Sequence, residues 1–416
     1  MVEYPYWVWL SLALIPGTDA FAKLRASFSS VRKIYEATEA ELVAVLGERK
    51  DMTIKRLMNK RFDRVQKILD YVHINDIGML VYDDPKFPKS LKEIKNPPAM
   101  LYYKGTLPNF DHAFFVSVVG SREHSDYTKR MTYEIGYDLA RGGATLVSGM
   151  AKGLDSIALT GALAAGGKVI AVLGSGIDII YPKEHVYLSK VIASHGVVMT
   201  EFPPATPPYG HNFPIRNRIM SALGHAVLVT GGREKSGALI TADVAKEQGK
   251  VLFALPGNVD DPYCVASDML LREGAKPALC ADDILSYFEC KFKYVICMAR
   301  LLPEVHHDVD RVLDRAKVCY TRSTPIEIVS EQTQQQVLVE EQPKSDEAAR
   351  EREEALSQLC EEERLLYERI PKGKAVHMDE LVGDGLTAQK VMSKSTMLEV
   401  KGLIKFLPGG RIIRVE

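Results

Sequence analysis

The sequence predicts an α/β protein with a doubly wound parallel sheet at its core, a small helical module before it and a winged helix after it. Short apolar runs alternate with amphipathic helical patterns between residues 111 and 290. Strands that are buried on both faces and alternate with helices form parallel sheets. Apolar residues recur at helical spacing before residue 75, and the last 60 residues combine helical patterns with a hairpin pattern.

Composition limits the possible classes of protein. At about 150 residues per domain, 416 residues suggest two to four domains. The hydrophobic share of 46% and the charged share of 26% are typical of globular proteins, which excludes a fibrous or wholly disordered chain. Lys and Arg number 53 and Asp and Glu number 54, so any surface for nucleic acid must be a local patch.

Cysteine spacing and the N-terminus favour a cytoplasmic protein that does not associate with membranes. None of the six cysteines forms a CxxC pair, so reduced thiols are expected in place of a zinc ribbon. The apolar run 7–15 is too short to span a bilayer. It also lacks the preceding basic residues of a signal peptide.

Residues 1–75 are predicted to form the helical module. Residues 22–69 hold 12 basic and 6 acidic residues, a surplus of six positive charges. The turn 12–17, which ends in Ile15, Pro16 and Gly17, is typical of a helix-hairpin-helix, whose amides can face a DNA phosphate. A plain helical capping module explains the same pattern equally well.

Residues 76–290 form the predicted core. The stretch 76–110 is rich in proline and is expected to be an irregular lead-in that packs on the sheet. The predicted strands cover 114–119, 144–147, 168–173, 197–199, 226–229 and 251–255, and the predicted helices cover 127–141, 154–165, 184–194, 215–223 and 238–248. Ligands of such sheets bind at the carboxyl ends of strands and at helix N-termini.

Residues 291–354 are predicted to be a linker that is acidic in its second half. Residues 331–364 carry 11 acidic and 4 basic residues, which is typical of a solvated segment. Residues 355–416 then show three helical patterns, followed by a hairpin pattern over 403–414. That order predicts the winged helix.

Glycine-rich turns follow the first two core strands. After the first strand, Gly120 is expected to let the backbone approach a ligand, Ser121 offers a hydroxyl, and Arg122 offers a fork to phosphate. A loop-tying ion pair is the alternative for Arg122. Either Ser125 or Asp126 caps the next helix. After the second strand, Asp155 is expected to be an N-cap.

The turn after the third strand supplies a cation but no nucleotide-binding fingerprint. Its Gly-Ser-Gly at 174–176 is short of a full GxGxxG. Lys183 follows, where a phosphodiester could reach it, although a solvated surface lysine explains it equally well. The sequence 161–168 resembles a Walker A loop but lacks the Gly-Lys-Ser/Thr step, so it gives no support for ATP hydrolysis.

Two later segments complete the predicted rim of the sheet. Arg216 and Arg218 lie about 200° apart on a helix, so one is expected to face the cleft while the other makes an internal ion pair. Phe213, at the start of the same helix, is an aromatic on which a base could stack. Lys235, Ser236 and Gly237 open the next helix and offer an anion a positive helix end. No catalytic triad, metal-ligand cluster or close carboxylate pair is evident at these ends, so no cofactor or metal is expected.

These segments, in this order, resemble the DNA-processing protein A family, also called Smf or DprA, over about residues 84–277. The matching segments are VVGSR (118–122), LVSGMAKGLD (146–155), GGKVIAVLGSGIDIIYP (166–182), TEFPP (200–204), FPIRNRI (213–219), SGALITA (236–242), FALPGN (253–258) and LLREGA (270–275). The sequence departs from the usual residues of the family at Leu159, at 231–232 and at 266–268.

The resemblance implies a Rossmann-like core that binds single-stranded DNA and works as a homodimer. It also implies that the protein protects incoming strands during natural transformation and helps to load the RecA recombinase onto them. The spaced cations and amide-rich turns favour binding without sequence preference. The expected DNA-binding residues are Gly120, Ser121, Arg122, Lys183, Phe213, Arg216, Arg218, Lys235, Ser236 and Gly237.

Two other functions are alternatives to this one. Nucleotide phosphoribohydrolases use a similar sheet with a PGGxGTxxE motif, but the corresponding turn here, GGREKSGALITA, lacks the Glu. A nicotinamide-binding regulator is disfavoured by the truncated GxG. The sequence therefore predicts a DNA-binding protein without enzymatic activity.

Overall fold

The computed structural model describes residues 3–48 and 51–297, and in the C-terminal part residues 361–371, 376–381, 383, 391, 394–395, 398, 403–407 and 411–414. The chain divides into two compact units, residues 1–326 and 327–416. The predicted boundaries at 75 and 290 lie inside the first unit and stay predictions. Of the linker predicted at 291–354, all beyond residue 297 lies outside the described residues.

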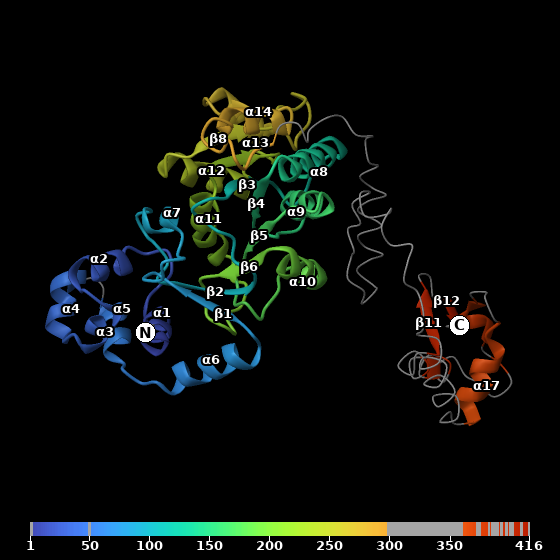
Figure 1. The fold of residues 1–416 in the computed structure, drawn as a ribbon, viewed down its shortest axis with the longest axis horizontal. Coiled ribbons are helices and arrows are strands. Elements are labelled where there is room, and N and C mark those ends of the chain that lie inside the picture. The colour runs from blue at the N-terminus through green and yellow to red at the C-terminus, as the bar shows by residue number, and fades with distance from the viewer. Residues whose placement is uncertain are drawn as a thin grey trace. The chain divides into compact units, whose positions relative to one another are not determined.

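Six helices form the N-terminal part of the first unit (Figure 1). They are α1 (Tyr4–Ala13), α2 (Ala20–Ser27), α3 (Val31–Glu36), α4 (Glu39–Leu46), α5 (Asp51–Met58) and α6 (Asp63–Ile74). Helix α4 begins with a reciprocal capping box, in which Thr38 and Glu41 each accept the other's amide hydrogen. Trp7, Trp9 and Leu10 of α1 are buried, so this helix forms the centre of the module.

A nine-stranded sheet forms the rest of the unit, in the order β1-β2-β6-β5-β4-β3-β7-β8-β9. Its strands are β1 (Gly78–Val81), β2 (Met100–Gly105), β3 (Phe114–Val119), β4 (Ala144–Ser148), β5 (Val169–Val172), β6 (Val197–Thr200), β7 (Ala226–Val229), β8 (Val251–Ala254) and β9 (Lys276–Pro277). Strands β3 to β9 pair in parallel. Every residue of β3 to β7 is buried, as expected for strands covered on both faces.

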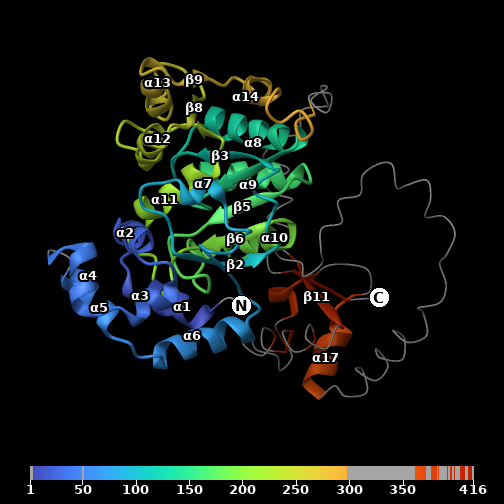
Figure 2. The ribbon, with the colours of Figure 1, turned by 60° about the vertical axis from the view of Figure 1, so that its left-hand side comes forward.

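Helices cover both faces of this sheet (Figures 1 and 2). Helices α8 (Asp126–Arg141), α9 (Leu154–Ala164) and α10 (Val186–His195) lie on one face, and α11 (Asn212–Leu223) and α12 (Gly237–Glu247) lie on the other. The short α7 (Lys89–Lys92), the 3-10 turn η2 (Lys183–His185), α13 (Val265–Arg272) and α14 (Ala281–Phe288) complete the unit. The predicted strands and helices of the core are thereby confirmed, with boundary shifts of a few residues.

The predicted irregular lead-in was wrong in part. Residues 78–81 and 100–105 form β1 and β2, which pair antiparallel with each other and extend the sheet beyond β6. Prolines interrupt the surrounding sequence, but Leu101 and Tyr102 are fully buried and provide strand-forming side chains. The sheet is therefore mixed at this edge and parallel elsewhere.

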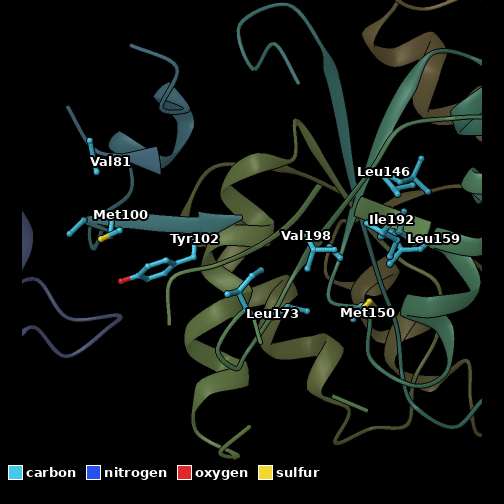
Figure 3. Packing of buried hydrophobic residues seen from close by; sticks show 14 of the residues in the cluster. Val81, Met100, Tyr102, Leu146, Met150, Leu159, Leu173, Ile192 and Val198 are labelled. Carbon is cyan, nitrogen blue, oxygen red and sulfur yellow. The ribbon is translucent and has the colours of Figure 1, made fainter. Parts of the chain in front are cut away.

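One buried cluster joins the helical module to the sheet. It includes Trp7 and Leu10 of α1 as well as Met100 and Tyr102 of β2. Figure 3 shows Met100 and Tyr102 together with other members of this cluster, such as Leu146 of β4. The module and the sheet thus share a hydrophobic core.

The described part of the second unit contains a three-stranded sheet and helical segments. Helix α17 (Glu361–Arg369), β10 (Val376–His377), the 3-10 turn η5 (Met378–Leu381), β11 (Ile404–Leu407) and β12 (Arg411–Arg414) are present. β11 and β12 pair antiparallel, which confirms the predicted hairpin, and β10 adds to β12. The two other predicted helices lie largely outside the described residues, so the winged helix stays a prediction.

Candidate functional site

The strand order reverses between β3 and β7, which lie side by side at the centre of the parallel sheet. From β3 the chain proceeds outward to β4, β5 and β6, and it then returns to β7 and continues to β8 and β9 on the other side. This is the topological switch point, where α/β sheets form a crevice at the carboxyl ends of the strands. A cavity of about 440 Å³, here called the switch-point cavity, lies at this position.

The switch-point cavity contains eight of the ten predicted site residues. Its lining includes Gly120, Ser121, Arg122, Phe213, Arg216, Lys235, Ser236 and Gly237. These residues come from the loop after β3, the start of α11 and the loop after β7. Segments up to 117 residues apart in the sequence thus meet at one end of the sheet, as the alternation of strands and helices predicts.

The loop after β3 is fixed by the backbone of its neighbours. The Ser121 amide donates to the Gly231 carbonyl over 3.1 Å, and the Ser121 carbonyl accepts from the Leu154 amide over 3.1 Å. The Ser121 hydroxyl donates to the Glu123 carbonyl. A Cβ on Gly120 would come within 2.6 Å of the Leu154 side chain. The glycine is therefore required for packing against α9, and its approach to a ligand stays a prediction.

Arg122 is exposed at the lip of the switch-point cavity. Its guanidinium carbon lies 5.9 Å from the centre of the Phe213 ring, within the range of a cation–π contact. Among the described residues no carboxylate pairs with it, so the alternative of a loop-tying ion pair has no partner in this part of the chain. Its guanidinium can therefore donate to a bound anion.

The floor of the switch-point cavity is formed by Arg216 and Asp155, both buried. Arg216 donates to the Gly149 carbonyl over 2.8 Å and to the Val172 carbonyl, so it ties together the ends of β4 and β5. A Cβ on Gly149 would lie 2.2 Å from the guanidinium, which only a glycine avoids. Arg216 is thus the arginine of α11 that faces the cleft, as a cation beneath the surface.

Asp155 balances this buried charge and joins three segments. It was expected to be an N-cap, but the N-cap of α9 is Gly153 and Asp155 lies inside the first turn. Its carboxylate accepts from the amides of Gly120 and Ala151 over 3.3 and 3.4 Å. Burial raises the pKa of Asp155, while the charge of Arg216 and these amides oppose the rise.

Arg216 remains a cation in this setting. Burial lowers the pKa of Arg216 to about 10, and the Asp155 charge works against that change. Its guanidinium is therefore protonated at neutral pH. The floor of the cavity consequently carries a fixed positive charge next to the Asp155 carboxyl group.

The Phe213 ring lies near the guanidinium groups of Arg122 and Arg216 and also lines a second cavity. The ring is half-buried, and the guanidinium of Arg216 lies 6.0 Å from its centre. A Cβ on Gly174 would come within 2.8 Å of the ring, so this glycine makes room for it. The Tyr181 ring lies 5.7 Å away, tilted by 45°. This pair offers aromatic surface to a planar group.

The second cavity, here called the β5 cavity, has a volume of about 430 Å³ and lies beyond the end of β5. It shares Arg122, Ala151 and Phe213 with the switch-point cavity, so the two adjoin. Lys183, the ninth predicted site residue, lines the β5 cavity and is exposed. Lys152 also lines it and was not predicted, although it lies within a quoted motif.

The loop after β7 gives the switch-point cavity the N-terminus of α12. Ser236 is the N-cap and accepts from the Ala238 amide over 3.3 Å. Lys235 is exposed, and apart from neighbouring residues and the backbone of α12, no atom lies within 4 Å of the position of a Cβ on Gly237. The free space beside this turn and the partial positive charge of the helix end favour a bound anion.

Arg218 does not belong to the site. It makes two 2.8 Å hydrogen bonds to the Glu201 carboxylate, and both side chains are almost completely buried. It lines neither cavity. The structure therefore gives no support to the prediction that Arg218 contacts DNA. Arg218 instead forms the internal ion pair that was expected of one of the two arginines.

The turn 12–17, which the sequence suggested as a helix-hairpin-helix, packs against other residues of the first unit. The Gly17 carbonyl accepts from the Asn96 side-chain amide over 2.7 Å. A Cβ on Gly17 would lie 2.9 Å from the Ile215 side chain of α11. The turn therefore packs on the core, which favours the capping module among the two alternatives.

Sequence reasoning also missed Glu123 and Arg233, which both line the switch-point cavity. They form an ion pair with 3.3 Å between Arg233 Nε and Glu123 Oε2. Arg233 stands inside a glycine-rich turn that the sequence singled out, and Glu123 directly follows another, VVGSR (118–122). Nothing in the sequence shows that charges 110 residues apart face each other.

The cavities, cations and helix end together define an α/β protein with a cation-lined crevice at its topological switch point. A family model described as DNA recombination-mediator protein A matches residues 78–289, slightly more than half of the chain. The protein belongs to this family, which confirms the resemblance seen in the sequence.

Individual relatives agree with this assignment. The DNA processing protein DprA of Bacillus subtilis is 34% identical over 235 residues, which cover 56% of this chain and 79% of that protein. The DNA processing protein DprA of Streptococcus pneumoniae is 38% identical over 208 residues, which cover 50% of this chain and 72% of that protein. An X-ray structure of the pneumococcal protein superposes with a TM-score of 0.61 at 30% identity and covers 69% of this chain and 98% of that one.

Two further observations concern the described residues alone. None of their helices combines the length and the apolar character needed to cross a membrane. No group of three or more His, Cys, Asp or Glu side chains among them is arranged to hold a metal ion.

Proposed function

We propose that this protein binds single-stranded DNA, without sequence preference, along the switch-point cavity and the β5 cavity. The observation that carries the proposal is the pair of adjoining cavities around Phe213, with Arg122, Lys183 and Lys235 exposed on their rims. Phosphates of a strand would lie against these cations and the α12 N-terminus, and bases would stack on Phe213 and Tyr181.

The chemistry of the site favours an unpaired strand. Every base has an aromatic face, so stacking on Phe213 requires no particular sequence, but it does require a base that is not enclosed in a duplex. The described core residues that line the cavities present turns and helix ends, which contact phosphates, and they present no helix shaped to enter a major groove. Sequence-independent binding follows from contacts of this kind.

The wider role proposed here follows the family. The names of the relatives, DNA processing protein and DNA recombination mediator, support a role in handling DNA. We propose that the protein acts in the cytoplasm as a homodimer, protects incoming strands during natural transformation and helps to load RecA onto them. Sedimentation tests the homodimer, and the rate of RecA filament formation on a single strand tests the loading.

The direct test compares labelled single strands with duplexes of equal length by fluorescence anisotropy. The proposal expects tighter binding of single strands and equal affinity for strands of different base composition. Equal affinity for duplex and single strand would contradict it. Nucleoside monophosphates are incubated in parallel, because release of free base would instead support the phosphoribohydrolase alternative.

A further inference from the structure

An ion pair joins the two loops that border the switch-point cavity. Glu123 belongs to the loop after β3 and Arg233 to the loop after β7, and both side chains line the cavity. Arg233 Nε lies 3.3 Å from Glu123 Oε2, and the two side chains are 54% and 70% exposed. A cation of the proposed DNA site is thus already occupied by a carboxylate of the protein.

The position of Arg233 is fixed independently of Glu123. Its guanidinium lies 4.7 Å above the ring of Tyr263, and Nη2 donates to the Tyr263 hydroxyl over 3.1 Å. The loop of Tyr263 is itself held, because its carbonyl accepts from the Gly232 amide over 2.6 Å and its amide donates to Asp261 over 2.8 Å. Tyr263 therefore keeps the guanidinium at the cavity when Glu123 releases it.

The partners of Arg233 differ in how easily they are exchanged. The contact with Tyr263 is an aromatic stack combined with a hydrogen bond, and it leaves other N–H groups of the guanidinium available. The contact with Glu123 is an exposed ion pair, which is weakened by water and salt. Such a pair changes an equilibrium constant by a factor of only about two to five. A phosphodiester can therefore take the place of Glu123 without displacing Tyr263.

We propose that Glu123 is a built-in competitor for the DNA phosphate. It holds Arg233 when the cavity is empty, and it yields Arg233 to a phosphodiester when a strand is bound. This inference rests on the proposed function and adds Arg233 as a phosphate-binding residue. Glu123 lowers the affinity for single strands, both by occupying Arg233 and by repelling phosphate.

Glu123→Gln tests this role, with Glu234→Gln as the matched control. Glu234 follows Arg233 in the sequence, and its carboxylate is exposed but does not line the cavity. The two variants change the net charge equally. Binding of labelled oligothymidylate is measured by fluorescence anisotropy at low salt. Glu123→Gln should bind about two- to fivefold tighter than wild type, and Glu234→Gln should change the affinity less.

Arg233→Gln completes the test. This variant should bind more weakly, with a salt slope reduced by about 0.7 for one lost phosphate contact. In its background, Glu123→Gln should gain less affinity than it does in the wild-type background, because only the repulsion of phosphate by Glu123 is then removed. Equal gains from Glu123→Gln and Glu234→Gln in the wild-type background would overturn the inference while leaving DNA binding intact. A wild-type protein that binds no oligothymidylate would instead overturn the proposed function.

Discussion

The two ends of strand β3 are built from different chemistry, although every residue between them is buried. At the amino end, Phe114 packs against Phe288 and Phe292, with ring centres 5.1 and 4.9 Å away, and against His225. At the carboxyl end, the strand opens into Gly120, Ser121 and the exposed Arg122. One end closes the sheet with aromatic rings, and the other presents charges to a cavity.

This difference indicates that substitutions at the two ends of β3 should affect stability and DNA binding separately. Substitutions at the amino end remove apolar contacts far from the cavity, so they should change stability alone. Substitutions of exposed cations at the carboxyl end remove no buried contact, so they should change binding alone. The following predictions test that separation in order of decreasing effect.

Phe114→Ala should have the largest effect, a loss of about 3–5 kcal/mol in the free energy of unfolding, because it empties a fully buried site. Urea unfolding measures the loss. Phe114→Leu is the control and should cost less, since it keeps most of the volume. Protein that remains folded should bind single strands as wild type does, and a matching loss of affinity would contradict the separation.

Arg122→Ala should weaken the binding of single strands by about 10- to 150-fold, which corresponds to a charge-assisted hydrogen bond of roughly 1.5–3 kcal/mol. The salt slope should fall by about 0.7. Arg130→Ala, an exposed arginine of α8 that lines neither cavity, serves as the control. An unchanged salt slope together with a lower melting temperature would assign Arg122 to structure instead.

His225 should make stability depend on pH between about 4 and 6.5. Burial, helped by the charges of Lys250 and Lys291, lowers the pKa of His225 from 6.5 to about 4. As the pH falls through this window, the unfolded chain binds a proton that the folded protein does not, so stability falls; below pH 4 the effect is complete.

The expected loss at His225 is on the order of 1–2 kcal/mol after allowance for its partial exposure to solvent. Urea unfolding at several pH values measures it, and His225→Gln should flatten this part of the profile. A wild-type profile that is flat between pH 6.5 and 4 would show that the imidazole gains its proton as easily in the folded protein.

Lys183→Ala should have the smallest effect, a two- to fivefold loss of affinity at moderate salt with a salt slope lower by about 0.7. Lys168→Ala is the matched control, because Lys168 is also exposed but immediately precedes β5, at the opposite end from the β5 cavity. Equal losses from both variants would point to a general effect of charge and would exclude a contact at the cavity.

Much of the core could be predicted because its strands are continuous apolar runs between glycine-rich turns. Strands β1 and β2 could not, because prolines on both sides mask two short segments whose pairing depends on the distant β6. The apolar character of a strand segment shows that the segment is buried. It does not show which neighbour it meets.

The sequence predicts those site residues that directly follow the end of a strand. It misses those whose role depends on a partner distant in the sequence. Arg122 and Lys235 follow directly from the loops that carry them. One of Arg216 and Arg218 was expected to face the cleft and the other to form an internal ion pair, and they do so, but the sequence does not show that Glu201 pairs with Arg218. The roles of Asp155, Glu123 and Arg233 likewise arise only when three loops meet.

Helix α11 links the helical module to the cavities through adjacent residues. Phe213 and Arg216 line the switch-point cavity, while Ile215 packs against Gly17 of the module. Removing residues 1–75 would therefore uncover Ile215 and loosen the helix that carries the stacking ring. Loss of DNA binding after this truncation would therefore not show that the module itself contacts DNA. Substitutions of exposed residues of the module in the full-length protein test for such contacts directly.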